Sequence, residues 1–207
     1  MLFAVSCFIM TIKFKITEGE RDVEELVRHI RQELARRERL LLAIDGRCGC
    51  GKSTLAARLA ADFGGSIFHM DDFYLPFEKR AENWRELPAG NMDLARFRDE
   101  VLELLHRGEA VSYRAYDCRN DRFLPTRVLA PTPLAIVEGS YSEHPLLREY
   151  YDLRVFLTAP AAVQRARLLA REGERFPAFK ALWIPMEERY FAAFSIEERA
   201  DRVLVSE

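Results

Sequence analysis

A glycine-rich segment that ends in lysine and serine is the part of this chain best suited to chemistry. Residues 46–53 read GRCGCGKS and match the pattern GxxxxGK(S/T) at every fixed position. Glycines let successive backbone N–H groups turn inward around phosphate oxygens, and the N-terminus of a following helix adds partial positive charge. In such a loop the lysine reaches the β- and γ-phosphates and the serine binds Mg²⁺.

This pattern predicts a nucleotide site and assigns its members. The phosphate-binding positions are Gly46, Arg47, Cys48, Gly49, Cys50, Gly51, Lys52, Ser53 and Thr54. Lys52 is also a catalytic candidate, because its charge can neutralise a phosphoryl group in transfer. Ser53 is a candidate metal ligand. A glycine-rich turn that starts a helix and binds nothing is the alternative.

Acidic residues elsewhere in the chain complement this loop. Glu138 follows four apolar residues in LAIVE and is the candidate to orient the waters of Mg²⁺, with a structural salt bridge as the alternative. Asp71 and Asp72 lie in HMDDFYLP, directly after another apolar run. One of the two can accept a proton from an attacking hydroxyl group, unless both merely cap a turn. His69 precedes them, although a histidine at the end of a strand is more often structural.

Alternating strands and helices must position these groups. Short apolar runs predict the strands, and apolar residues at helical spacing predict the helices. The predicted strands are 39–45, 66–70, 133–139, 152–158 and 201–205. The predicted helices are 21–39, 161–171 and 185–199, one that runs from the glycine-rich segment to Gly64, and one around 94–105. This alternation implies three layers, α/β/α, with a mostly parallel five-stranded sheet that binds ligands at its carboxyl edge. Together with the phosphate-loop motif between the first strand and the next helix, it predicts a P-loop NTPase fold.

The chain is expected to form one main domain, residues 40–207, with an N-terminal strand and helix (residues 1–39) packed on it. Alternating apolar residues at 12, 14 and 16 favour an edge strand there. The apolar run 1–12 lacks a basic start and a cleavage site, and it is too short to span a bilayer. A true start at Met10 is the alternative for the first nine residues.

Charge and cysteine content exclude several classes of protein. The 31 Lys and Arg residues against 33 Asp and Glu residues give a net charge of −2, so no overall positive field attracts a nucleic acid. Four cysteines, at positions 7, 48, 50 and 118, match neither a disulfide framework nor zinc spacing, which favours reduced thiols in the cytoplasm. The anion-binding loop is a setting that lowers thiol pKa, so Cys48 and Cys50 can be reactive. The simpler interpretation is that they are small residues that fit a tight loop.

The ordered motifs resemble the uridine kinase, phosphoribulokinase and pantothenate kinase group of P-loop kinases. The likeness runs from about residue 40 to 205. Besides the phosphate loop it rests on HMDDFYLP, GNMDLARF, YRAYDC, IVEGSY, the arginine-bearing segment AVQRARLLARE and ADRVLV. The resemblance implies a P-loop kinase domain over residues 40–207, with a small lid over the site.

The resemblance also implies roles for individual residues of the acceptor site. Asp71 is the expected general base toward the acceptor hydroxyl, and Tyr74 is expected nearby in the acceptor pocket. Asp93, in GNMDLARF, is expected to hydrogen-bond ribose hydroxyl groups, and Tyr116 to pack against a nucleobase. After Tyr116 the chain lacks the histidine that uridine kinases use to read the base. The resemblance therefore does not assign the base.

Two arginines are expected on the lid. Arg167 and Arg171 are four residues apart and so share one helix face. The resemblance implies that Arg167 contacts the substrate and that Arg171 covers the phosphoryl group in transfer, a role that suits the fixed donors of guanidinium. Two solvated cations on an amphipathic helix are the alternative. Residues 173–180 form a short segment for a lid, and Trp183 has no predicted partner.

The resemblance implies an ATP-dependent enzyme that transfers the γ-phosphoryl group to a hydroxyl group of a small molecule, with Mg²⁺ as the second cofactor. A nucleoside such as uridine or cytidine is the expected acceptor, and pantothenate, a sugar, glycerate or a nucleoside monophosphate is the alternative. A regulatory ATPase is the alternative class, while the lack of an NKxD-type guanine reader disfavours a GTPase. The expected partner is a small molecule rather than a nucleic acid or a membrane, and a homo-oligomer remains open.

Overall fold

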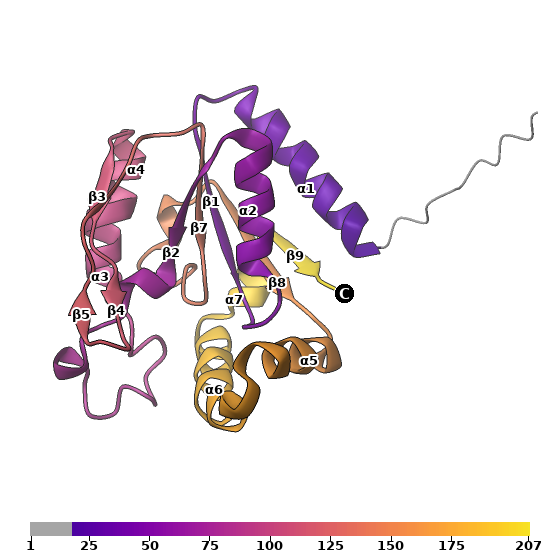
Figure 1. The fold of residues 1–207 in the computed structure, drawn as a ribbon. Coiled ribbons are helices and arrows are strands. Elements are labelled where there is room, and N and C mark those ends of the chain that lie inside the picture. The colour runs from indigo at the N-terminus through magenta and orange to yellow at the C-terminus, as the bar shows by residue number, and fades with distance from the viewer. Residues whose placement is uncertain (1–17) are drawn as a thin grey trace, which may run out of the picture.

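The structure, a computed structural model, describes residues 18–207. Five strands form one sheet in the order β2-β7-β1-β8-β9, and every neighbouring pair is parallel (Figure 1). The strands are β1 (Leu40–Gly46), β2 (Ser66–His69), β7 (Leu134–Glu138), β8 (Leu153–Thr158) and β9 (Arg202–Val205). The predicted α/β fold is confirmed. The edge strand predicted near residues 12–16 lies outside the described residues.

Apolar side chains on both faces of the central strand hold the layers together. Leu40 and Leu42 of β1 pack in a cluster with α1 (Glu18–Leu34) and α2 (Lys52–Phe63). Ala43 points to the opposite face, where a second cluster lies. All seven residues of β1 are buried, as expected for a parallel strand that is covered on both sides.

The second face of the sheet is covered by an almost continuous helical segment and by small antiparallel ribbons. The helical segment consists of α3 (Leu94–Phe97), a π-helical turn (Arg98–Leu102) and α4 (Glu103–Arg107). The ribbons pair β3 (Val111–Tyr113) with β6 (Arg127–Leu129), and β4 (Tyr116–Asp117) with β5 (Arg122–Phe123). Short 3₁₀ helices occupy Met70–Phe73, Phe77–Lys79 and Arg148–Tyr150.

Two long helices lie beneath the carboxyl ends of the strands (Figure 1). These are α5 (Ala161–Glu172) and α6 (Phe176–Phe194), joined by a 3₁₀ turn (Gly173–Arg175) and followed by α7 (Ile196–Arg199). We call residues 161–194 the lid. Its small core contains Leu168 and Phe176 and extends to Cys48 of the phosphate loop.

The start of α6 differs from the sequence prediction. The helical pattern predicted a helix over residues 185–199, although proline is common in the first turn of a helix and another proline lies upstream. Instead Pro177 occupies that first turn, and Pro185 lies inside the helix. Of residues 173–180, expected to form a short lid segment, 173–175 form the 3₁₀ turn and 176–180 begin the 19-residue helix α6. Within residues 18–207 no helix has both the length and the apolar character needed to cross a membrane.

Candidate active site

The phosphate loop lies between the end of β1 and the start of α2. Gly46 has a φ of +133°, and a Cβ atom there would lie 2.0 Å from the carbonyl oxygen of Leu157, so no larger residue fits. Gly51 precedes α2 with a φ of +94°, which also favours glycine. The Lys52 ammonium donates to the carbonyl oxygens of Gly46 and Arg47 at 2.6 and 3.1 Å. The Lys52 ammonium is therefore held against the backbone of the loop.

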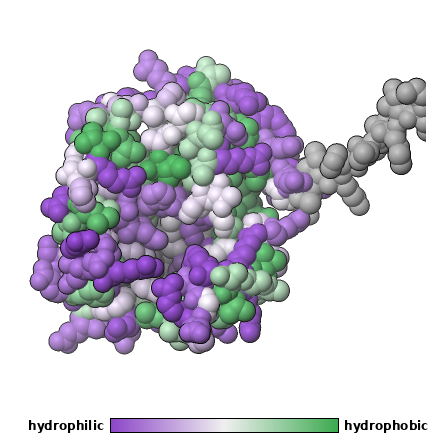
Figure 2. All heavy atoms as spheres, in the orientation of Figure 1, coloured by the Kyte–Doolittle hydropathy of each residue, from purple (hydrophilic) through white to green (hydrophobic). Residues whose placement is uncertain are grey.

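A cavity of about 980 Å³ opens at this loop, between the sheet and the lid. The face in Figure 2 is hollowed there, with hydrophilic side chains around the hollow. Most lining residues come from the loop and the start of α2, from the carboxyl ends of β2 and β7, and from the lid, and single residues come from α1, β8 and the segment after β9. Those used below are Cys48, Lys52, Ser53, Asp71, Tyr74, Glu138, Ser140, Tyr141, Arg167, Arg171, Phe179, Trp183 and Glu187.

The register of the sheet brings a hydroxyl group and a carboxylate together as the sequence predicted. Glu138 pairs with His69 in the neighbouring strand and with Ile44 in β1, so it lies beside the start of the loop. The Ser53 hydroxyl is 3.2 Å from both Glu138 oxygens. Hard oxygen ligands of this kind fit Mg²⁺, which typically takes one or two protein groups together with phosphate oxygens and water. Within residues 18–207 no cluster of three or more metal-binding side chains occurs.

His69 is tied to the same carboxylate. Its Nδ1 atom hydrogen-bonds to Oε1 of Glu138, and this bond raises the pKa of His69. The contact supports the structural interpretation of this histidine, because it helps to orient the carboxylate that Ser53 also contacts.

Asp71 and Asp72 both lie in the 3₁₀ turn that follows β2, and their side chains contact different partners. Asp71 lines the cavity and accepts a hydrogen bond of 2.9 Å from the Tyr74 hydroxyl. The protein wall around it raises its pKa by desolvation, although the side chain is open to the cavity. Asp72 points elsewhere and accepts from the Tyr113 hydroxyl at 2.7 Å and from Arg127 at 3.0 Å. Asp71 is thus the member of the pair that faces the site.

A lid carboxylate that sequence reasoning missed contacts the phosphate loop. Glu187 on α6 accepts hydrogen bonds from the backbone N–H of Cys48 at 3.0 Å and from the Ser140 hydroxyl at 2.6 Å. It is 7% exposed, so these bonds are largely shielded from water. The signal that could have revealed Glu187 is that an acidic residue shares the buried face of α6 with Met186 and Tyr190.

Of the three arginines that the sequence assigned to the site, one forms ion pairs outside the cavity and two line it. Arg47, in the loop, turns its guanidinium away from the cavity and pairs with Glu188 at 2.7 Å and Glu197 at 2.9 Å. Arg167 lines the cavity and donates to the Ser206 hydroxyl at 2.8 Å. Arg171 also lines the cavity, and its guanidinium lies 5.2 Å from the centre of the Phe179 ring.

Two predicted substrate contacts lie outside the cavity lining. Asp93 accepts a hydrogen bond from the backbone N–H of Arg96 at 3.2 Å and so caps α3. The Tyr116 hydroxyl bonds to Asp121, and its ring contacts Phe123 edge to face. The structure therefore brings Asp71, Tyr74 and Glu138 to the phosphate loop, whereas it places Asp93 and Tyr116 in local structural contacts.

The hypothesis of reactive loop thiols, the less favoured of the two interpretations, is not supported. Cys48 and Cys50 are buried, and burial raises the pKa of both thiols, that of Cys50 to about 11. Their desolvation outweighs the nearby positive charge of Lys52. The simpler interpretation, small residues in a tight loop, fits this structure.

A lid above a phosphate loop on a parallel sheet is the arrangement of P-loop kinases, nucleotide-binding transferases that act on small molecules. The chain belongs to the phosphoribulokinase / uridine kinase family, whose sequence profile matches residues 41–175. Membership implies the use of ATP. A search among curated proteins found no match.

Solved structures of the same fold include proteins described as kinases. A candidate uridine kinase from Bacillus stearothermophilus is 22% identical with a TM-score of 0.69, over 91% of this chain and 100% of that chain. A candidate fructose transport system kinase from Silicibacter sp. TM1040 is 26% identical with a TM-score of 0.66, over 86% of this chain and 98% of that one. The likeness to the first shows the fold.

Proposed function

We propose that this P-loop kinase uses ATP and Mg²⁺ to phosphorylate a hydroxyl group of a nucleoside. The observation that carries the proposal is the separation of Asp71 from Asp72, because it leaves one carboxylate open to the cavity that also holds Lys52. A carboxylate in that place has the chemistry of a general base.

The loop and the end of β7 supply the donor half of the site. Backbone N–H groups of the loop and the Lys52 ammonium bind phosphate oxygens. Ser53 and Glu138 hold Mg²⁺, directly or through water. When bound, the metal ion neutralises negative charge on the phosphate oxygens. Arg171 adds a cation from the lid to the same cavity.

The carboxyl edge of β2 supplies the acceptor half. The acceptor oxygen forms a bond to the γ-phosphorus as the bond to the β-phosphate oxygen breaks, and the acceptor proton passes to Asp71. The Tyr74 hydroxyl, which donates to Oδ1 of Asp71, leaves Oδ2 to receive that proton. The raised pKa of Asp71 makes its carboxylate a stronger base than an exposed aspartate.

A sugar is the second candidate acceptor, favoured by the likeness to the candidate fructose transport system kinase. Both candidates present a neutral hydroxyl group.

An acceptor screen tests the proposal. Purified protein with ATP and Mg²⁺ is given uridine, cytidine, adenosine, ribose, fructose or pantothenate, and ADP release is measured against a reaction without acceptor. The proposal predicts nucleoside-dependent release. Release that is equal with and without every acceptor would indicate a regulatory ATPase, and release with fructose alone would support the sugar.

A further inference from the structure

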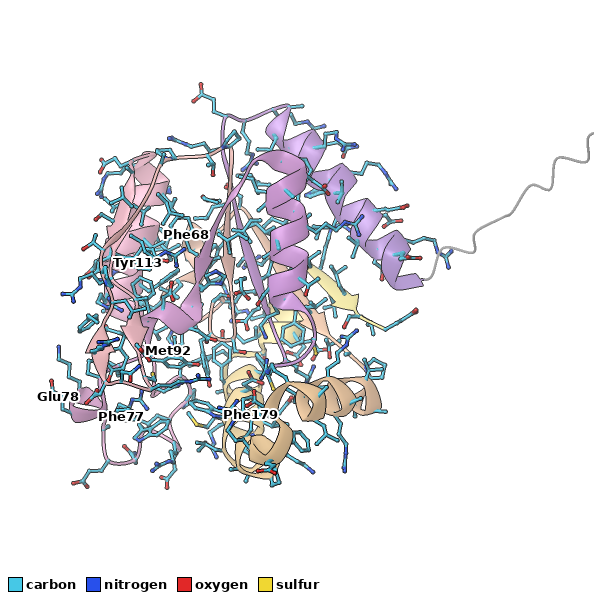
Figure 3. All side chains as sticks on the ribbon, viewed as in Figure 1. Phe68, Phe77, Glu78, Met92, Tyr113 and Phe179 are labelled. Carbon is cyan, nitrogen blue, oxygen red and sulfur yellow. The ribbon has the colours of Figure 1, made fainter. Side chains whose placement is uncertain are left out.

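Three aromatic side chains line the cavity beside the proposed base. The Trp183 ring centre lies 6.1 Å from that of Tyr74 and 6.4 Å from that of Phe179, with interplanar angles of 48° and 42°. All three are half-buried members of the cavity lining. Tyr74 belongs to the segment after β2, whereas Trp183 and Phe179 belong to α6 of the lid. Figure 3 shows Phe179 on the edge of the lid that faces the segment carrying Met92 and Phe77.

The three rings follow one another away from Asp71. The Tyr74 hydroxyl is 2.9 Å from Asp71, and the Tyr74 ring then leads to Trp183. An acceptor whose hydroxyl group lies at Asp71 and whose body extends along Tyr74 meets the indole of the lid. Arg171 lies against Phe179 and lines the same cavity as Lys52 and the phosphate loop.

The chemistry of the ring faces selects the kind of group that can lie on them. A sugar can contact an aromatic face only through its C–H groups, and its hydroxyl groups find no hydrogen-bond partner on that face. A planar heteroaromatic ring has faces that need no hydrogen bonds and edges that stay accessible, and it stacks well on tryptophan and tyrosine.

We infer that Trp183, supported by Tyr74 and Phe179, is the stacking surface for a planar heteroaromatic ring of the acceptor, so that the lid determines acceptor specificity. The inference rests on the proposed function, because it takes the cavity beside Asp71 as the acceptor site. The inference gives α6 the contact with the acceptor ring that the family resemblance implied for Tyr116.

The tryptophan content of the chain allows a direct binding test. The chain has two tryptophans, and Trp84 is 9% exposed, lies between Arg80 and Arg85, and is outside the cavity lining. In Trp84→Phe, Trp183 is the remaining indole, so its fluorescence can be titrated with uridine or adenosine and with ribose, each with and without saturating ADP. We expect a saturable change in emission with the nucleosides and none with ribose. Subtracting the emission of Trp183→Phe from that of the parent gives the same signal if Trp84→Phe does not fold.

Kinetics of Trp183 variants provide the second measurement. Loss of one stacked base contact costs about 1–3 kcal/mol, so Trp183→Leu should raise the KM for the nucleoside about 5- to 150-fold. The KM for ATP should change less than about twofold, and Trp183→Phe should restore most of the loss, since its ring still stacks.

The outcomes separate the inference from the proposed function. Nucleoside turnover with unchanged Trp183 emission, and an unchanged nucleoside KM in Trp183→Leu, would overturn the inference and leave the kinase intact. Turnover with ribose or fructose alone would overturn both the inference and the nucleoside proposal. If no acceptor is phosphorylated, a nucleoside-specific emission change still supports the ring site, whereas its absence overturns it.

Discussion

A buried carboxylate behind the phosphate loop predicts an unusual dependence of stability on pH. Glu143 is completely buried, and neither of its carboxylate oxygens has a hydrogen-bond partner. It lies beside Asp45, the buried residue just before the loop, which accepts from the N–H of Gly46, the N–H of Glu143 and the Tyr190 hydroxyl. Burial, together with the neighbouring Asp45 charge, raises the pKa of Glu143 to about 9.

The sign of the effect follows from proton binding. Because the pKa of Glu143 is higher in the folded than in the unfolded protein, the folded protein holds a proton at neutral pH that the unfolded chain has released. The free energy of unfolding therefore falls as pH rises from the ordinary glutamate pKa toward the folded value. One proton corresponds to about 1.4 kcal/mol per pH unit, which is the largest slope that Glu143 can contribute.

The change Glu143→Gln removes this titration and keeps the shape of the side chain. We expect the variant to gain stability over the parent between pH 6 and pH 8, by up to about 1.4 kcal/mol for each unit. Urea unfolding at pH 6, 7 and 8 measures the difference. A difference that does not change with pH would refute the reasoning. It would mean that Glu143 is ionised, with Arg148, which is 5% exposed, as its counter-charge.

Three further predictions concern the loop and the lid. Lys52→Ala should lower turnover by about 10²- to 10³-fold, since loss of one preorganised charge-stabilising donor has an effect of this size. The far-ultraviolet circular dichroism spectrum should stay unchanged. Retained turnover would show that Lys52 does not belong to the site. Glu187→Ala should lower the free energy of unfolding in urea by about 1–3 kcal/mol, because two shielded donors lose their acceptor. The matched change Glu188→Ala breaks a half-exposed ion pair and should cost about 0–1 kcal/mol, so equal losses would refute the lid contact. Iodoacetamide at pH 7 should label Cys48 and Cys50 far more slowly in the folded protein than in urea, because burial raises the pKa of both thiols. Mass spectrometry measures the labelling, and fast labelling of the folded protein would contradict the raised pKa values.

The sheet was predictable because burial on both faces leaves a clear sequence pattern. Residues 39–45 form a short apolar run that ends in a glycine motif, and β1 occupies nearly the same range. The ribbons of two or three residues, such as Tyr116–Asp117, were missed because they are too short to show alternation. Pro185 misled the prediction of α6, since proline inside a helix is unfavourable and the sequence offered a second proline at the true start.

The site was predictable where the motif itself fixes the geometry. Lys52 and Ser53 lie at the loop because strand, turn and helix are contiguous in the chain. The contacts of Glu187 and Trp183 depend on how the lid packs against the sheet, more than a hundred residues along the chain from the loop or from Asp71, and no local pattern reports such packing. Asp93 has a motif that suggests ligand binding, yet aspartate is also a preferred helix cap, which is how the structure uses it.

The most direct test of the account compares the two adjacent aspartates in one assay. Acceptor-dependent ADP release is measured with uridine for the parent, Asp71→Asn and Asp72→Asn, with the KM for ATP determined in each. The account predicts that Asp71→Asn lowers kcat by about 10²- to 10⁴-fold with little change in the KM for ATP, as loss of a general base should. Asp72→Asn, which weakens contacts to Tyr113 and Arg127 outside the cavity, should lose much less. Equal losses in both variants, or full activity in Asp71→Asn, would contradict the assignment of Asp71 as the base.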